Sequence, residues 1–593
     1  MLDTKVKGEV HLSDTELKVP SDMVLKGVNG HIKFTENSVV AENVQANLLG
    51  GDALINVSTI ERGAPPSLRF SGAGRLDSKE LSIWLGKAIV NQIAGETNWS
   101  GYLDITKQGV KIDAESALEG IKFDLPAPFA KSAGETRDLA ISLKSGTQLK
   151  NSLDISIGNN IDLNFHALSN QGGNLLDSGQ IKVGEVKSVD SETAGIAIDV
   201  KQEKVNLDQW IAALSDISRV PAEKTAKINF VDQLRKITIN TQDLTLFSKP
   251  LGAVNAVATA TDGKVWQARL SGENVAGDVL LEPFENPARY TLNLDRLLWP
   301  HTPKDDDEEY TEPPRFISDD RQPSSWPAVI GTVQEFHALG KSLGKMEINA
   351  SPQNNKWLIN DFRLSRDGID VIATGEWLRR ENENLTDTRL NIVLNSISAG
   401  EALNDLGFEE LMADGSVKFI SDVDWVGAPS DFHLSRLNGT YELDVRKGRF
   451  PKVNPKSGRF FGLLNVNNLT RRLRLDFKDV FGSGLIFDHM ESSGFVTQGD
   501  LVLKRFFIYS PSVYVQANGK VGLAKENYDM ELLVSPQLGG NLALFSALTN
   551  PAAGAVVFLA QKVFKKQFNK AIVYTYSIDG PWKKPVIERV TNE

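Results

Sequence analysis

The residues that usually carry chemistry in a protein are few in this sequence and lie far apart. The 593 residues include no cysteine, which excludes disulfides, thiolate metal sites and cysteine nucleophiles. Phosphate-binding glycine loops, nucleophile elbows and zincin motifs are also absent from the sequence. The histidines show no metal-ligand spacing to one another or to carboxylates, at positions 11, 31, 166, 301, 337, 433 and 489. We therefore predict no catalytic residue, no metal site, no cofactor and no enzyme.

The charge balance narrows the class of partner. The formal net charge is -11, whereas nucleic-acid binding needs a concentrated basic face. We therefore expect no nucleic-acid partner. The acidic run Asp305–Glu309 lacks the spaced ligands and turn glycine of a calcium loop, so it favours a solvated loop.

Apolar side chains near the C-terminus offer a different chemistry, which is contact with lipid. Within residues 541–570 apolar residues recur at helical spacing, and no charge occurs before Lys562. The apolar positions are Leu542, Leu544, Phe545 and Leu548, and after Pro551 they are Val556, Val557, Phe558, Leu559, Val563, Phe564 and Phe568. The lysines near the end are Lys562, Lys565, Lys566 and Lys570.

This segment predicts a helical hairpin and not a transmembrane helix, because prolines and glycines divide the apolar run into short pieces. Lysines in the last turns favour the helix dipole and gain roughly 1 kcal/mol each near an anionic lipid surface. We expect the hairpin to contact an anionic lipid surface. The alternative is a helical plug that caps the last sheet edge.

The elements that must position these residues are mostly strands. Polar and apolar residues alternate with period two over 236–247, 289–297, 441–450, 471–478 and 571–580. Asn-Gly and Asp-Gly pairs at 29–30, 262–263, 367–368, 438–439 and 518–519 predict hairpin turns. The pattern favours a mainly β fold with very large antiparallel sheets, on the order of 30 to 40 strands.

Short helices and one linker interrupt the strands. Asp77 or Ser78, Asp208 and Ser398 are each placed to cap a short helix, which suggests either an array of sheet segments or unrelated helices. The Pro- and acid-rich stretch 299–327 has no periodicity and predicts a loop or linker. The expected divisions are β-groove segments at 1–298, the linker at 299–327, a second β-groove at 328–534, the helical hairpin at 535–570, and a terminal strand and tail at 571–593.

A large one-layer sheet leaves an apolar face to be covered, and too few amphipathic helices are encoded to cover it. Each exposed Leu- or Phe-sized side chain forfeits roughly 2 kcal/mol. The sheet can curl around bound acyl chains, or it can pack as a sandwich or solenoid with a dry core. The candidates to line such a groove are Leu473, Leu475, Phe477, Leu501, Leu503, Val513 and Val515. Alternation alone cannot decide which face is concave, because a one-residue slip reverses every assignment.

The C-terminal third also carries recognisable motifs. GAPSDFHLSRLNGTYELDVRKGRF (427–450) and SGRFFGLLNVNNLTRRLRLDFKDVFGSGLIFDHM (457–490) resemble the C-terminal region of the YhdP family of AsmA-like proteins from diderm bacterial envelopes. LEGIKFDLPAPFAKSAGE (118–135) and VNLDQWIAAL (205–214) also resemble family motifs. The resemblance covers essentially the whole chain. Family members are usually about twice as long and carry an N-terminal inner-membrane helix, which the charged first twenty residues do not resemble.

The resemblance implies an elongated, curled, taco-shaped β-groove in the periplasm that carries phospholipids between inner and outer membranes without cofactor or covalent chemistry. It also implies a role in outer-membrane integrity. The partners would be phospholipids, the inner leaflet of the outer membrane, and a missing N-terminal half that holds the inner-membrane anchor. Two alternatives stay open: an assembly factor that binds proteins by strand addition and carries no lipid, and a hydrolase with a site formed only on folding.

Overall fold

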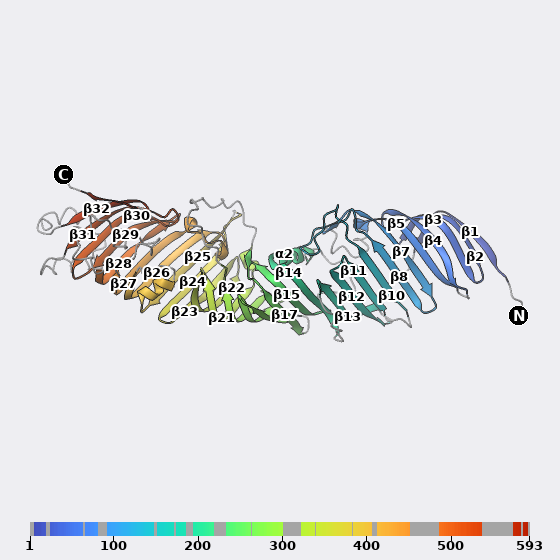
Figure 1. Ribbon diagram of the computed structural model, residues 1–593, viewed down its shortest axis with the longest axis horizontal. Helices are drawn as coiled ribbons and strands as arrows, with labels where there is room; N and C mark the ends of the chain where they lie inside the picture. Colours follow the sequence, from blue (N-terminus) through green and yellow to red (C-terminus); the bar gives the residue numbers. More distant parts are fainter. Residues whose placement is uncertain are drawn as a thin grey trace. The chain divides into compact units, whose positions relative to one another are not determined.

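A computed structural model of the chain consists mainly of β-strands (Figure 1). It describes residues 5–18, 24–62, 66–80, 92–146, 151–170, 173–185, 194–218, 233–261, 264–300, 322–338, 340–381, 384–405, 412–450, 485–536, 573–582 and 585–590. Within these residues 31 strands belong to the main sheet, and β6 and β9 form a separate two-stranded ribbon. Backbone contacts divide the chain into unit 1, Met1–Leu281, and unit 2, Glu282–Glu593.

Unit 1 contains the first nineteen strands and one described α-helix. The strands are β1 Lys7–Lys18, β2 Val24–Thr35, β3 Ser38–Leu48, β4 Gly51–Glu61, β5 Ser67–Asp77, β6 Ile93–Ala94, β7 Glu96–Thr106, β8 Gly109–Ser116, β9 Lys122–Phe123, β10 Leu139–Ser145, β11 Asn151–Ile157, β12 Ile161–Asn170, β13 Gly173–Val183, β14 Gly195–Asn206, β15 Leu234–Leu246, β16 Lys249–Pro250, β17 Val254–Thr261, β18 Val265–Gly272 and β19 Val275–Glu282. The helix is α2 Leu207–Ser218.

Unit 2 contains the remaining strands, one described α-helix and three 3-10 helices. The strands are β20 Arg289–Leu298, β21 Ala328–Ala338, β22 Lys341–Gln353, β23 Lys356–Arg366, β24 Ile369–Arg379, β25 Thr386–Ser396, β26 Ala413–Val426, β27 Asn438–Phe450, β28 Leu485–Thr497, β29 Asp500–Tyr509, β30 Val513–Gly522, β31 Asn527–Pro536, β32 Tyr574–Pro581 and β33 Val586–Val590. The helices are α4 Ala399–Asp405, η1 Pro323–Ser325, η2 Pro429–Asp431 and η3 Leu434–Arg436.

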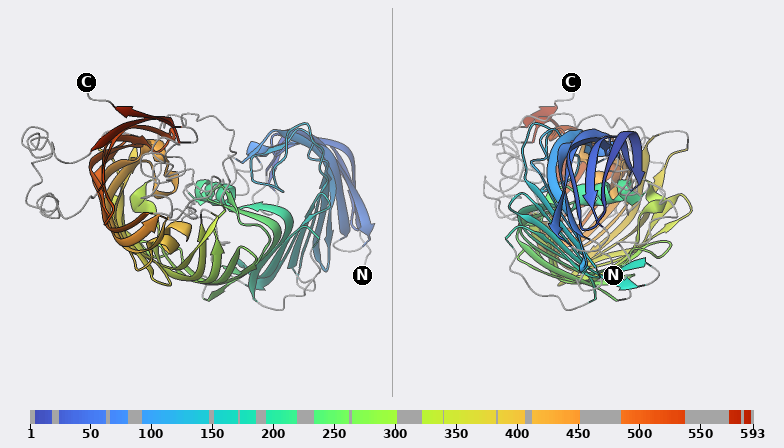
Figure 2. Two further views of the ribbon diagram at one scale, coloured as in Figure 1. Left: turned by 60° about the vertical axis from the view of Figure 1, so that its left-hand side comes forward. Right: turned by 90° about the vertical axis from the view of Figure 1, so that its right-hand side faces the viewer.

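Most strands pair antiparallel with their neighbours in sequence, and each unit's sheet curls on itself (Figure 2). The expected mainly β fold, with a curled sheet and few short helices, is confirmed. The sheet is mixed, because β13–β14, β14–β15 and β20–β21 pair in parallel. A parallel neighbour requires the chain to cross back to the edge where the previous strand began. The long connections 184–194, 207–233 and 299–327 make these crossings.

The strands follow the predicted alternation. In β17, Val254, Ala256 and Ala258 are sheltered, whereas Asn255 and Val257 between them are exposed. The periodic stretches at 236–247, 289–297, 441–450 and 571–580 correspond to β15, β20, β27 and β32. Stretch 471–478 lies outside the described residues.

The predicted hairpin turns were mostly wrong. Asp367–Gly368 does join β23 to β24. By contrast, Asn29–Gly30 lies inside β2, Asn518–Gly519 lies inside β30, and Asn438–Gly439 begins β27, while Asp262–Gly263 lies outside the described residues. At Gly519 the backbone has φ +125°, and a Cβ there would lie 2.5 Å from the Cα of Met530. The glycine therefore serves close strand approach and not a turn.

The helix caps agree with the sequence in part. Asp77 accepts a bond from Lys79 N at 2.8 Å, and Ser398 accepts one from Glu401 N at 3.3 Å. Asp208 is not the cap of α2, because Asn206 Oδ1 accepts the bond from Gln209 N. The Asp208 carboxylate instead accepts bonds from the backbone of Phe247 and Ser248 at 2.8 and 2.7 Å, and so ties α2 to the turn after β15.

Candidate functional site

One face of unit 1 carries an unbroken apolar stripe. Cross-strand register places Phe70, Leu103, Ile112, Leu143, Leu153 and Phe165 opposite one another in one row. A second row two residues away holds Ala114, Ile141, Ile155, Leu163, Ile181, Ile198, Ile237, Ala258, Ala268 and Val279. We call these two rows the apolar stripe. The stripe continues across the parallel pairs β13–β14 and β14–β15, because residues that are paired in register point to the same face of the sheet.

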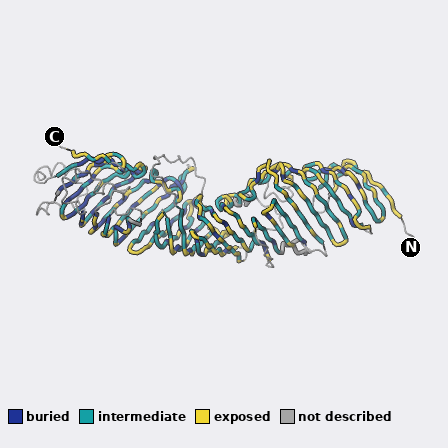
Figure 3. Tube along the Cα trace, in the orientation of Figure 1, coloured by how far each residue is buried: buried dark blue, intermediate teal, exposed yellow. Residues whose placement is uncertain are grey.

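Side chains of the stripe are sheltered only in part. Ile141, Leu153 and Ile198 are half-buried, and the tube in Figure 3 shows mainly intermediate exposure along these strands. The ring of Phe165 covers Gly179, where an added Cβ would lie 2.4 Å from the ring. A Leu- or Ile-sized side chain gains about 1.5–3 kcal/mol on full burial, so the stripe retains an unsatisfied preference for apolar contact.

The opposite face of the same strands is polar. Cross-strand hydrogen bonds join Asn164 to Asp154 at 2.9 Å and Gln180 to Asp199 at 2.9 Å. Arg269 donates to both carboxylate oxygens of Asp278. Side chains alternate between the two faces of a strand. These polar pairs therefore lie on the face opposite the apolar stripe and do not cover it.

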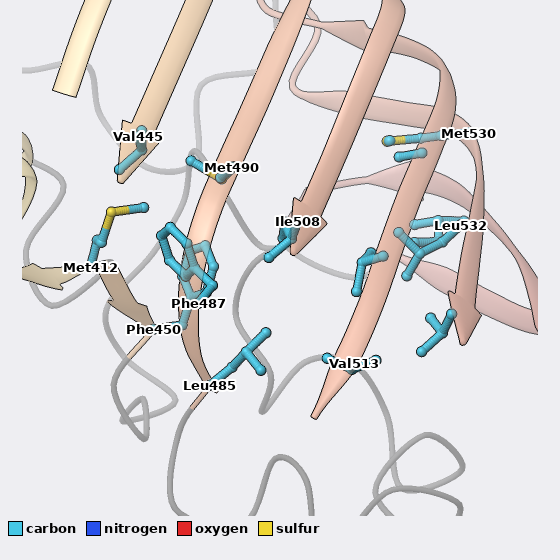
Figure 4. Close-up of a cluster of buried hydrophobic side chains, with 14 of the residues drawn as sticks. Met412, Val445, Phe450, Leu485, Phe487, Met490, Ile508, Val513, Met530 and Leu532 are labelled. Carbon is cyan, nitrogen blue, oxygen red and sulfur yellow. The ribbon is translucent and has the colours of Figure 1, made fainter. Parts of the chain in front are cut away.

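Unit 2 carries a denser apolar cluster on one face of its sheet (Figure 4). Phe487 and Val513 are fully buried, and the register continues from Met490 to Ile508 and Val515. Ala399 of α4 and Met412 pack against this cluster, so α4 covers part of the apolar face. Buried segments gather in these C-terminal strands in Figure 3.

The structure places four groove candidates on this face. Val513 and Val515 belong to the buried cluster, and Leu503 packs against it. Leu501 packs against the adjoining cluster of Trp425, Leu437 and Val496. Leu473, Leu475 and Phe477 lie outside the described residues, as do all membrane-contact candidates between Leu542 and Lys570.

A bulge explains why alternation could not be extended along β29. The register of β29 shifts between Leu503 and Phe507. Phe506 and Ile508 therefore pack in the cluster, whereas strict alternation from Leu503 would place Arg505 on that face. Phe507 is buried on the other face, where its ring lies 6.4 Å from Tyr514 and 5.2 Å from His489. Burial raises the pKa of Tyr514 to about 12, so this phenol stays protonated.

Two capping segments meet along one edge of unit 1. Loop 117–138 follows β8, and α2 follows β14. From β8 to β14 the sheet passes through four antiparallel pairs and one parallel pair, so β8 and β14 run in the same direction and their C-terminal ends lie at the same edge. Phe129 of the loop and Trp210 of α2 stack edge to face with centroids 5.7 Å apart. We call the loop and α2 together the rim.

The loop of the rim is held by two cations, Lys131 and Arg137. The Lys131 ammonium is buried and donates to the carbonyls of Ile121 and Ser132 at 2.8 and 3.1 Å. Burial lowers the pKa of Lys131. Arg137 donates to the carbonyls of Pro128 and Ala130 at 2.9 Å each, which fixes the backbone around Phe129.

The shifted carboxylates do not resemble a general acid. Burial alone would raise the pKa of Asp444, but hydrogen bonds from Arg446 and His489 outweigh burial and lower it. The same balance lowers the pKa of Asp113 to about 2. A general acid at neutral pH needs a raised carboxyl pKa, so both groups serve as anions in ion pairs.

Comparison with known proteins places the chain in a family. A family model described as "YhdP protein" matches residues 2–587. The chain belongs to the YhdP protein family. A curated relative, "Intermembrane phospholipid transporter YhdP" of Escherichia coli (strain K12), is 23% identical over 597 residues. The alignment covers 99% of this chain and 46% of that relative, so the chain spans less than half the relative's length.

The YhdP family assignment confirms the resemblance read from the sequence motifs. Two of these motifs build the rim, because 118–135 forms most of its loop and 205–214 begins α2. Among the described residues, no helix has both the length and the apolar character needed to cross a bilayer.

Proposed function

We propose that the chain is part of a non-enzymatic conduit that moves phospholipids between the inner and outer membranes of a diderm bacterium. Acyl chains would lie against the apolar stripe of unit 1 and against the apolar face of unit 2, with the headgroups toward water. The observation that carries the proposal is the stripe itself, which joins half-buried apolar residues across consecutive strands. The name of the E. coli relative, an intermembrane phospholipid transporter, supports phospholipid as the cargo.

The proposed mechanism requires no covalent step. A lipid leaving a bilayer exposes its chains to water at a cost of about 0.8 kcal/mol per methylene. An apolar surface that continues from strand to strand replaces that water at each step and lowers the barrier to movement. The concave side of the curl would be the apolar face, and the whole conduit, in the periplasm, would support outer-membrane integrity.

The test uses two neighbouring residues that face opposite sides of β17. Ala258 belongs to the stripe, whereas Val257 is 39% exposed on the polar face. The wild-type chain is expected to retain phospholipid on purification, detected by mass spectrometry of the extract. Ala258→Arg should remove most of that lipid because a guanidinium in the stripe is incompatible with acyl chains, while Val257→Arg should retain it.

Three results would contradict the proposal: a lipid-free wild-type chain, equal lipid in both variants, or lipid transfer between vesicles unaffected by Ala258→Arg. Protein partners captured on a lipid-free chain would instead support an assembly factor. That alternative has one structural basis, because among the described strands β1 pairs with β2 alone and β33 with β32 alone. Such free edges can accept a strand from a partner.

A further inference from the structure

The first two strands bring together residues that are far apart in sequence. His11 of β1 pairs directly with His31 of β2, and their rings meet edge to face with centroids 4.1 Å apart. Glu9 lies two residues before His11, so its side chain is on the same face. One ligand atom from each of the three side chains lies within 4.8 Å of the others.

The apolar face fixes this register. Leu12 and Ile32 pack with the buried cluster around Val28 and Val44. Their neighbours His11 and His31 must then point to the opposite, exposed face. The three side chains are therefore held by the sheet and remain open to solvent.

Two imidazoles and one carboxylate are a common ligand set for zinc. In a tetrahedral site with bonds of 2.0–2.2 Å, ligand atoms lie about 3.4 Å apart. Side-chain rotation can bring atoms from within 4.8 Å to that spacing without moving the strands. A water molecule would complete the tetrahedron, since the cluster is exposed.

We propose that Glu9, His11 and His31 bind a zinc ion that fastens β1 to β2. The ion would bridge the two strands on the polar face, opposite the apolar packing of Leu12 and Ile32. Because β1 pairs with β2 alone among the described strands, the bridge would protect a strand that has hydrogen bonds on one side only. Lys33 stands opposite Glu9 in the register, so its ammonium would compete with the metal for the carboxylate.

The test is calorimetric titration of the chelator-treated full chain with zinc chloride at neutral pH. The wild type is expected to bind one zinc with micromolar or tighter affinity. His11→Ala and His31→Ala should each weaken binding at least about 10-fold, since loss of even an outer-shell partner costs about 10- to 100-fold. His166→Ala removes an exposed histidine of β12 and should leave the affinity unchanged.

Two further readouts separate a true site from loss of structure. Lys33→Ala keeps all three ligands and should bind zinc equally or more tightly. Zinc should also slow amide exchange in β1 and β2 of the wild type but not in those of His31→Ala. The far-UV circular dichroism of His31→Ala should equal that of the wild type, which shows that the variant folds. The proposal fails if the wild type binds no zinc at micromolar concentration, if the His11→Ala/His31→Ala double variant binds as tightly as the wild type, or if Lys33→Ala abolishes binding.

Discussion

On the polar face of unit 1, Asp113 of β8 belongs to a group of charged and aromatic side chains in contact with one another. Its carboxylate lies 2.8 Å from the Lys111 ammonium. Lys111 also donates to the Tyr102 hydroxyl at 3.3 Å, and Arg69 lies over the Tyr102 ring at 4.2 Å. Burial alone would raise the pKa of Asp113, but the hydrogen bonds it accepts lower the value to about 2. The folded state therefore favours the anionic form of Asp113 over the protonated form.

This pKa predicts a pH-dependent contribution to stability. Because the folded value is below the ordinary value of 3.8, the contribution is present above about pH 4 and is lost as the pH falls toward 2. Asp113→Asn should lower the free energy of unfolding by about 1–2 kcal/mol at pH 7. Thermal unfolding at pH 7, 4 and 3 should show that the difference in stability between Asp113→Asn and the wild type becomes smaller as the pH falls. Asp124→Asn, at a side chain 72% exposed, is the matched control; a difference that stays constant down to pH 3 would contradict the assignment.

At the same scale, sequence reasoning found residue types but not their partners. Asp208 was expected to cap α2, yet its carboxylate binds the backbone of Phe247 and Ser248, some forty residues away. His11 and His31 showed no metal-ligand spacing because their closeness comes from strand pairing. An i, i+2 pair of Glu9 and His11 was visible in the sequence, but the register that adds His31 was not.

Among the elements, loop 117–138 and α2 of the rim contact each other through the rings of Phe129 and Trp210. Such a pair contributes about 0.5–1.5 kcal/mol beyond its buried area. Phe129→Ala and Trp210→Ala should therefore each speed amide exchange in loop 117–138 and at the start of α2, and the double variant should add little more. The core strands β10–β13 should exchange as in the wild type.

The control for this prediction is Phe284→Ala, which removes a phenylalanine that is 55% exposed between β19 and β20. It should leave exchange in the rim unchanged. Additive effects of Phe129→Ala and Trp210→Ala would show that the two rings stabilise their segments independently.

The elements themselves were largely predictable, since period-two alternation placed β15, β20, β27 and β32. The parallel pairs were not, because alternation is the same whichever way a neighbour runs. Stretch 299–327 was expected to be a loop or linker, but the sequence did not show that β20 and β21, on either side of it, pair in parallel. The bulge in β29 has no local sequence signal, since Phe506, Phe507 and Ile508 are all apolar.

For the whole molecule, membrane contact by segment 541–570 stays a proposal from its composition. Four lysines near its end would gain about 1 kcal/mol each at an anionic surface. The full chain should therefore float with anionic phospholipid vesicles, and a chain lacking 541–570 should not. Lys565→Glu/Lys566→Glu should reduce flotation with anionic vesicles more than with neutral ones. Equal flotation of the full and shortened chains would contradict the proposal and favour a cap on the sheet edge.

Pairing between neighbours in sequence has a consequence for the ancestry of the chain. Where a hairpin contacts only the strands before and after it, duplicating or deleting that hairpin leaves every other pair intact. Evolution could therefore lengthen or shorten such a sheet in small steps. The parallel crossings among the described strands would resist such changes, because removing one would reverse the direction of every strand that follows.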